Sequence, residues 1–216
     1  TDFDKLVALE KNLNDGTNKL VLSYDGFRRA LSYAIDREKL CEVSTPSFEP
    51  AIGLLSDGYY LDDYGYKDSK YRDTVEAKKA LVGFYGLVYG ENEKLKNLGE
   101  AYDSLTGYDV EKAKEMFKAV YDKAISDGNY KAGQLIKLRC MVSSNKELTK
   151  WEKAEEKAIN EMLAIATKGT GFEGKLSIEY VCGADNRYND CIEGNIEMIK
   201  GAWAGNLVSP YVTIGM

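Results

Sequence analysis

The stretch that decides the fold is IKLRCMVSSNKELTKWEKAEEKAINEMLAIATKGTGFEGKLSIEYV, residues 136–181. Its first segment, IKLRCMV, alternates apolar and polar side chains, which predicts a β-strand, and KLSIEYV near its end does the same. The segment between them, residues 148–169, has apolar side chains at helical spacing and therefore predicts a helix that ends near Gly169. A strand, a helix and a strand in this order form a βαβ unit, which predicts parallel strands and a right-handed crossover.

The spacing also predicts which side chains of this helix point inward. They are Leu148, Trp151, Ala158, Ile159, Met162 and Ile165.

Helices are predicted on the amino-terminal side of this unit, and one more strand on its carboxyl-terminal side. DGFRRALSYAIDREKL, residues 25–40, has one apolar helical face and Asp25 as its expected N-cap. YDVEKAKEMFKAVYDKAISDG, residues 108–128, predicts a helix capped by Asp109 and ended by Gly128. Residues 73–89 and 91–105 are expected to be helical, and IEMIKGAW to contain a short strand. The predicted fold class is α/β.

Composition excludes several function classes. The chain has 216 residues, a formal net charge of -6 and no histidine. An acidic chain lacks the clustered basic residues of a nucleic-acid-binding surface, so we expect no nucleic-acid partner. Without histidine it lacks the commonest metal ligand and the usual general base near pH 7, and we expect no metal and no cofactor.

The four cysteines have none of the spacings of a zinc or redox site. They are Cys41, Cys140, Cys182 and Cys191. Because no C-x-x-C pair is present, buried free thiols are the simpler interpretation, and a disulfide between Cys182 and Cys191 stays open as an alternative.

No sequence motif assembles an enzyme. Phosphate-binding glycine loops and the nucleophile motif G-x-S-x-G are absent. Glu155 and Glu156 are adjacent on the predicted helix and do not face each other, so a solvated helix face is expected for them. Asp62 and Asp63, which lie beside tyrosines, are consistent with a turn or, less simply, with a sugar or cation site.

The ends of the predicted strands are the favoured place for a ligand. In open α/β sheets, ligands bind outside the carboxyl ends of parallel strands. Two loops qualify: residues 143–147 after the first strand, and GAWAGN, residues 201–206. The first loop precedes a helix, so its backbone N–H groups suit an anion, while Ser144 or Asn145 can also cap that helix. The two interpretations are compatible.

Four stretches in order resemble the extracellular solute-binding proteins of family 5, the oligopeptide-, dipeptide- and nickel-binding components of ABC importers. FRRALSYAIDREKL resembles the signature helix of the family, and EPAIGLLSDGYY the loop after it. YDVEKAKEMFKAVYDKA is similar to the next helix, and NDCIEGNIEMIKGAWAGNLVSPY to the stretch that carries a strand, a Trp with small neighbours and a Pro.

The resemblance implies a fold and a function. Family members have two lobes that close over a peptide. The resemblance implies that residues 1–216 are a single domain, most of the C-terminal lobe, with the periplasmic-binding-protein type II fold and a mixed sheet flanked by helices. The expected function is capture of extracellular oligopeptides for import, without enzymatic activity. The expected partners are the ABC permease subunits and the N-terminal lobe, and the expected location is the cell surface, as a lipoprotein, or the periplasm.

The resemblance also implies site residues. Trp203 matches the family's Trp, and Ala204 and Gly205 match positions whose backbone lies along the peptide. The family's acid for the ligand ammonium corresponds to Asn206, an amide that gives no ion pair, so anchoring of a free N-terminus is expected to weaken. Lys200 replaces an Arg of some members and keeps its charge. Contacts to a ligand carboxylate are expected from the first loop, at Ser144, Asn145 and Lys146.

A surface sensing or interaction module that has the same fold and no transport function is the alternative. Permease and ATPase genes beside the parent gene would favour the importer.

Overall fold

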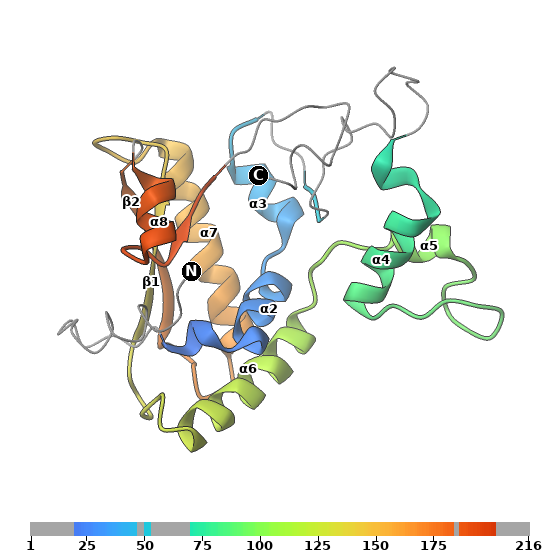
Figure 1. The fold of residues 1–216 in the computed structure, drawn as a ribbon, viewed down its shortest axis with the longest axis horizontal. Helices are drawn as coiled ribbons and strands as arrows, with labels where there is room; N and C mark the ends of the chain where they lie inside the picture. The colour runs from blue at the N-terminus through green and yellow to red at the C-terminus, as the bar shows by residue number, and fades with distance from the viewer. Residues whose placement is uncertain (1–19, 47–49, 53–69, 184–185, 202–216) are drawn as a thin grey trace. The chain divides into compact units, whose positions relative to one another are not determined.

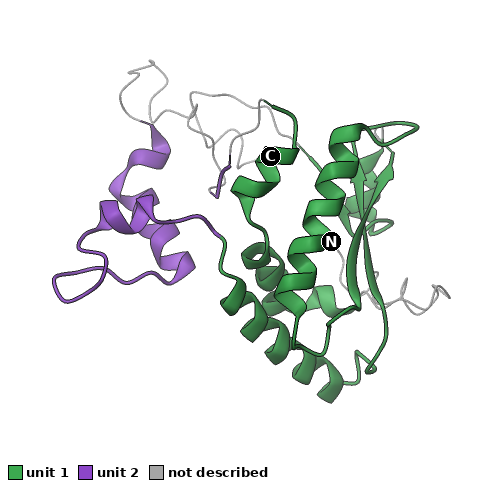
Figure 2. Cartoon of the chain, turned by 180° about the vertical axis from the view of Figure 1, so that it is seen from behind, with its two compact units in different colours: residues 1–49, 108–201 green, residues 50–107, 202–216 purple. Residues whose placement is uncertain are grey.

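The computed structural model describes residues 20–46, 50–52, 70–183 and 186–201 (Figure 1). The chain divides into two compact units, coloured separately in Figure 2: unit 1 comprises residues 1–49 and 108–201, and unit 2 residues 50–107 and 202–216. The units are groups of contacts within the chain, so the expected single domain over residues 1–216 stays a prediction.

The βαβ unit predicted from residues 136–181 is confirmed in unit 1. Strand β1 spans Ile136–Val142, helix α7 Lys150–Thr167 and strand β2 Leu176–Cys182. β1 and β2 are parallel over their whole lengths, with Leu138 opposite Ile178. Helix α8, Arg187–Glu193, leads to the two-residue strand β3, Met198–Ile199, which also runs parallel to β1.

The sheet is therefore three-stranded in the order β2-β1-β3. The α/β class is confirmed, but the expectation of a mixed sheet is wrong for the described strands, which are all parallel. The physical reason is that each pair of successive strands is joined through a helix, and such a crossover returns the chain in the same direction.

Helix α7 lies beside the sheet (Figure 1). Its polar side chains form hydrogen bonds with backbone groups on the outer edge of β2. Asn160 donates its Nδ2 to the Ile178 carbonyl at 2.8 Å and accepts the Ile178 amide at 2.9 Å. Glu156 accepts the Tyr180 amide at 2.7 Å. An unpaired strand edge invites pairing with another chain, so these contacts stabilise β2 as the end of the sheet.

The inward face of α7 differs from the prediction at several positions. Ile159 and Met162 are buried as predicted, but Ile165 is 53% exposed and Leu163 is buried in its place. Glu152 and Glu155 are also buried, at 5% and 2% exposure. The predicted solvated face is thus wrong for Glu155, whose buried carboxylate pairs with Lys200 at the end of β3.

Strand β3 is short, and ionic contacts hold it to β1. The Arg139 guanidinium donates to both carboxylate oxygens of Glu197, at 2.8 and 3.1 Å, and the Arg139 amide also donates to this carboxylate. Glu197 is 3% exposed at its side chain. The Lys200 amide continues the pairing by donating to the Met141 carbonyl at 2.9 Å. A bidentate Arg–carboxylate pair has fixed geometry and so sets the position of this strand.

The helix predicted over residues 25–40 is two helices, α2, Asp25–Ala34, and α3, Arg37–Val43. The chain breaks between them because Asp36 caps α3 by accepting the Lys39 amide. Arg37 then donates to the carbonyls of Ser32 and Ile35 at the end of α2. Asp25 is also not the N-cap: Tyr24 occupies that position without a side-chain cap, and Asp25 pairs with Arg28 in the first turn.

Helix α6, Val110–Ser126, begins and ends as predicted. Asp109 accepts the Lys112 amide as N-cap, and Gly128 follows the helix with φ +71°. Phe117 and Tyr121 of α6 belong to a cluster of edge-to-face aromatic rings. We name it the aromatic cluster and define it as Phe27, Phe117, Tyr121, Tyr130 and Phe172. Gly171 lies so close to this cluster that an added Cβ would be 2.2 Å from the Tyr121 ring.

Unit 2 contains the helices α4, Val75–Tyr85, and α5, Leu98–Asp103. Thr74 caps α4, and Gly86 ends it in the left-handed conformation. The helix predicted over residues 91–105 is shortened to α5, because Asn97 caps it by accepting the Glu100 amide. Short 3-10 helices complete the described structure, η1 at Leu20–Ser23 in unit 1 and η2 at Tyr71–Asp73 in unit 2.

Candidate functional site

The predicted site residues fall into two groups. Trp203, Ala204, Gly205 and Asn206 lie outside the described residues. Ser144, Asn145 and Lys146 follow β1 and Lys200 follows β3, so these residues lie at the carboxyl ends of neighbouring parallel strands. Asp62 and Asp63 also lie outside the described residues.

The loop after β1 is held by a carboxylate of α7. The Ser144 hydroxyl donates to Glu152 Oε2 at 2.6 Å, and the Thr149 amide donates to the same oxygen at 2.7 Å. Thr149 in turn accepts the Glu152 amide, which completes a capping box. The N-cap of α7 is therefore Thr149, and the expectation of a cap by Ser144 or Asn145 is wrong. Asn145 and Lys146 are exposed.

This arrangement weakens the prediction that the loop after β1 binds an anion. The Glu152 carboxylate already lies at the amino end of α7, where a bound anion was expected. Burial raises the pKa of Glu152, but hydrogen bonds from Ser144 and Thr149, together with the Lys200 charge, outweigh it, so the net pKa is lowered. A protein carboxylate thus occupies the position that favours negative charge.

Lys200 is held by the second buried carboxylate of α7. Its Nζ lies 2.5 Å from Glu155 Oε2, and its side chain is 35% exposed while that of Glu155 is 3% exposed. The contact spans 45 positions in sequence, from the second turn of α7 to the residue after β3. The Lys200 ammonium, which the resemblance implies as a ligand contact, is therefore already paired with a carboxylate of the protein.

These groups border a cavity of about 320 Å³, which we name the polar cavity. Its lining residues are Leu40, Cys41, Ser44, Cys140, Glu155, Tyr180, Ile199 and Lys200.

Two lining residues of the polar cavity have altered acidity. Burial raises the pKa of the Cys140 thiol to about 11, and the nearby Lys200 charge only partly opposes this. Burial also raises the pKa of Tyr180, and carboxylates of α7 add to the effect. Cys140 is therefore a neutral thiol near pH 7, without the thiolate that a nucleophile needs.

All four cysteines are free. The alternative of a disulfide between Cys182 and Cys191 is thus wrong. Burial is confirmed only for Cys140, and the other three are partly exposed.

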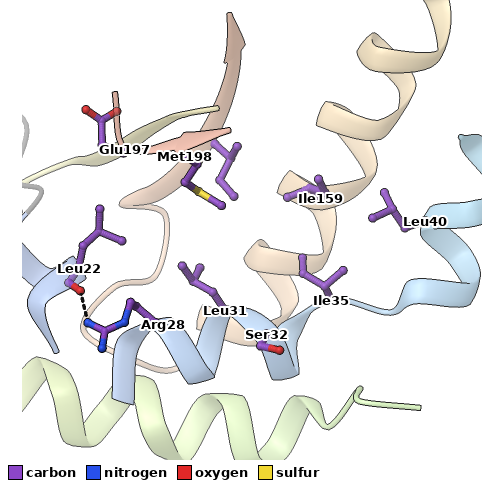
Figure 3. A pocket seen from close by; sticks show the side chains of 10 residues that line it. Leu22, Arg28, Leu31, Ser32, Ile35, Leu40, Ile159, Glu197 and Met198 are labelled. Atoms are coloured by element: carbon purple, nitrogen blue, oxygen red, sulfur yellow. Dashed lines mark hydrogen bonds between the residues drawn. The ribbon is translucent and has the colours of Figure 1, made fainter. Parts of the chain in front are cut away.

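A second cavity of unit 1, of about 410 Å³, is apolar (Figure 3). Leu31 from α2, Ile35 directly after α2, Ile159 from α7 and Met198 from β3 point into it. Its charged members have other partners: Arg28 donates to the Leu22 carbonyl at 2.6 Å, and Glu197 is paired with Arg139. This cavity brings no converging polar groups to a ligand.

The part of the chain that the structure describes contains no group of three or more potential metal ligands from histidine, cysteine, aspartate and glutamate. Within the same residues, no helix is long and apolar enough to cross a membrane.

Sequence reasoning missed Glu152 and Glu155 as members of this site. The sequence did contain a pattern that points to each of these two residues. Thr149 and Glu152 have the spacing of a capping box, and Glu152, Glu155 and Ile159 follow one another at three- and four-residue steps, which places both carboxylates on the inward face.

No protein-family model, curated protein or solved structure matches this chain. The resemblance to solute-binding proteins of family 5 therefore rests on the four quoted stretches, and the function it implies is a proposal.

Proposed function

We propose that this chain is the ligand-binding part of a solute-binding protein that captures extracellular oligopeptides for an ABC importer, and that its fold is a periplasmic-binding-protein type II lobe. The observation that supports it most is that the loop after β1 and Lys200 both lie at the carboxyl ends of neighbouring parallel strands. The resemblance implies ligand contacts from both, and ligands bind at this end of open α/β sheets.

The proposal includes partners and a location. The chain belongs to a two-lobed protein at the cell surface or in the periplasm, and it acts with permease subunits and without catalysis. The neutral Cys140 thiol agrees with a binding role, because it offers no ready nucleophile. Lys146 is exposed and is the cation of the first loop, so it is the better candidate for a peptide carboxylate than Lys200, which pairs with Glu155.

The test is calorimetric titration with a mixture of short peptides, using this chain and the longer parent protein. The parent is expected to bind, and the chain alone to bind much more weakly, because one lobe lacks half of the contacts and the closing motion. Absence of peptide binding by the parent would contradict the proposed function. Micromolar peptide binding by the chain alone would contradict the proposal that two lobes are needed to bind a peptide.

A substitution tests the amide at the position where the family has an acid. Asn206→Asp in the parent is expected to raise affinity for free-amine peptides over their N-acetylated forms by about tenfold, because charge-assisted hydrogen bonds are stronger than neutral ones. If the ratio of affinities for free-amine and N-acetylated peptides is unchanged, Asn206 does not contact the ligand's amino group.

A further inference from the structure

Glu155 has an unused hydrogen-bonding capacity beside the polar cavity. The residue is 2% exposed, and its Oε2 accepts Lys200 Nζ. Its other oxygen, Oε1, is buried and has no hydrogen-bond partner. A buried carboxylate oxygen is costly to leave unpaired, and nearly all such groups in proteins are satisfied by a donor. Glu155 lines the polar cavity, so a donor bound there lies beside this carboxylate.

The charges around the cavity favour a cationic donor. Three carboxylates of α7, those of Glu152, Glu155 and Glu156, each act on the Tyr180 hydroxyl and add to the effect of its burial. Among the lining residues, Lys200 carries the opposing positive charge. With three nearby carboxylates and one ammonium, a cation gains attraction in the cavity, whereas an anion is repelled.

The remaining walls suit a short apolar body. Leu40 and Ile199 are aliphatic, and Tyr180 contributes an aromatic ring of the kind that attracts cations to its face. The volume of about 320 Å³ lies at the small end of the range for ligand pockets. The cavity thus combines the Glu155 carboxylate with walls that are largely apolar.

We propose that the polar cavity binds a small organic ammonium ion, whose N–H groups donate to Glu155 Oε1 and whose apolar part contacts Leu40, Tyr180 and Ile199. The Lys200 ammonium remains on the other oxygen of the same carboxylate. This site concerns unit 1 alone and does not depend on the importer function, so either proposal can fail without the other.

The first test uses the unmodified chain and three probes of equal size: butylammonium, 1-butanol and butyrate. Backbone amide shifts near Tyr180 and Lys200 are followed by NMR at constant ionic strength, with sodium chloride as the reference salt. Butylammonium is expected to give saturable shifts and to bind at least about tenfold more tightly than 1-butanol, with butyrate weakest. Equal binding of 1-butanol, equal shifts from sodium chloride, or no saturable shift would each overturn the proposal.

The second test changes the carboxylate and its partner. Glu155→Gln is expected to lower butylammonium affinity about tenfold, since it removes the charge but keeps the shape. Glu161→Gln, on the same helix with a side chain that is 66% exposed, is the matched control and should leave affinity unchanged.

Lys200→Ala frees the second oxygen of Glu155 and is expected to raise butylammonium affinity about tenfold. Retained affinity in Glu155→Gln, or lost affinity in a folded Lys200→Ala, would contradict the assignment. If Glu155→Gln does not fold, the comparison of the three probes on the unmodified chain still decides.

Discussion

The two ends of the sheet in unit 1 are closed by different interactions. At the amino ends, the aromatic cluster packs edge to face: Phe27 lies 5.5 Å from Phe117 and 5.6 Å from Phe172 between ring centroids, and all three rings are fully buried. At the carboxyl ends, the buried groups are the carboxylates of Glu152 and Glu155, which hold a loop and a lysine.

We infer from this difference that one end of the sheet serves mainly the stability of the fold and that the other end serves ligand binding. Apolar burial is non-directional and stabilises in proportion to area, so the aromatic cluster is expected to supply much of the folding energy of unit 1. Buried ion pairs add little net stability, because desolvation opposes their attraction. Charges that add little stability but lie at strand ends, beside a cavity, agree with a role in ligand binding.

The largest expected effect comes from opening the aromatic cluster. Phe27→Ala should lower the free energy of unfolding by about 3–5 kcal/mol, because it removes a fully buried ring and leaves a cavity. Urea denaturation measures it. The same change at Phe84, which is 57% exposed in α4, is the control and should cost under about 0.5 kcal/mol. Similar costs at the two positions would contradict the role of the cluster.

A smaller effect is expected from removing one member of the buried ion pair. Glu155→Ala should cost about 2 kcal/mol, less than a fully buried pair would, because the Lys200 side chain is 35% exposed and can reach water. The double substitution Glu155→Met with Lys200→Met should be less destabilising than the single change, as judged by urea denaturation. A double variant that loses more than the single one would show that the pair itself stabilises the carboxyl ends.

The capping box at the start of α7 should contribute about 1 kcal/mol, as N-caps commonly do. Thr149→Ala removes the acceptor for the Glu152 amide, whereas Thr149→Ser keeps it and is the matched control. Thermal unfolding of the two variants gives the difference. Equal midpoints would mean that the contacts of Glu152 with Ser144 and the Thr149 amide are enough to hold the loop.

The smallest effect is a pH dependence at the carboxyl ends. Because the folded pKa of Glu152 lies below its ordinary value of 4.5, its ionised form stabilises the fold above about pH 4.5, and this part is lost as pH falls through the lowered pKa. Urea denaturation between pH 6 and pH 3 should show Glu152→Gln less stable than the unmodified chain near pH 6, with the gap closing toward pH 3. A gap that stays constant with pH would separate Glu152 from the acid response.

The sequence predicted an element correctly where the spacing of its apolar residues and its terminal residues indicated the same structure. The alternation in residues 136–142 and 175–181 predicted both strands, and Asp109 and Gly128 marked the ends of α6. Prediction from the sequence failed where a side chain had a partner distant in sequence. Helical spacing can place Glu155 on the inward face, but it cannot name Lys200, 45 positions later, as the partner that meets its charge.

The candidate site stays a prediction, and the sequence named only some of the residues that border the polar cavity. The rule that ligands bind at strand ends led to the loop after β1, and the resemblance led to Lys200. The structure places both at the carboxyl ends of neighbouring strands. The sequence did not indicate that Leu40 of α3 and Tyr180 of β2 line the same cavity. The distance between these two elements depends on how the helices pack on the sheet.

The sequence by itself determined the parallel βαβ unit, since period-two and period-3.6 patterns report which faces of a segment avoid water. Only the tertiary structure decided that α7 presents two buried carboxylates to the strand ends, and that one oxygen of Glu155 is left without a donor. The physical reason is that the cost of burying a charge depends on its partners in space, and those partners lie in other elements of the chain.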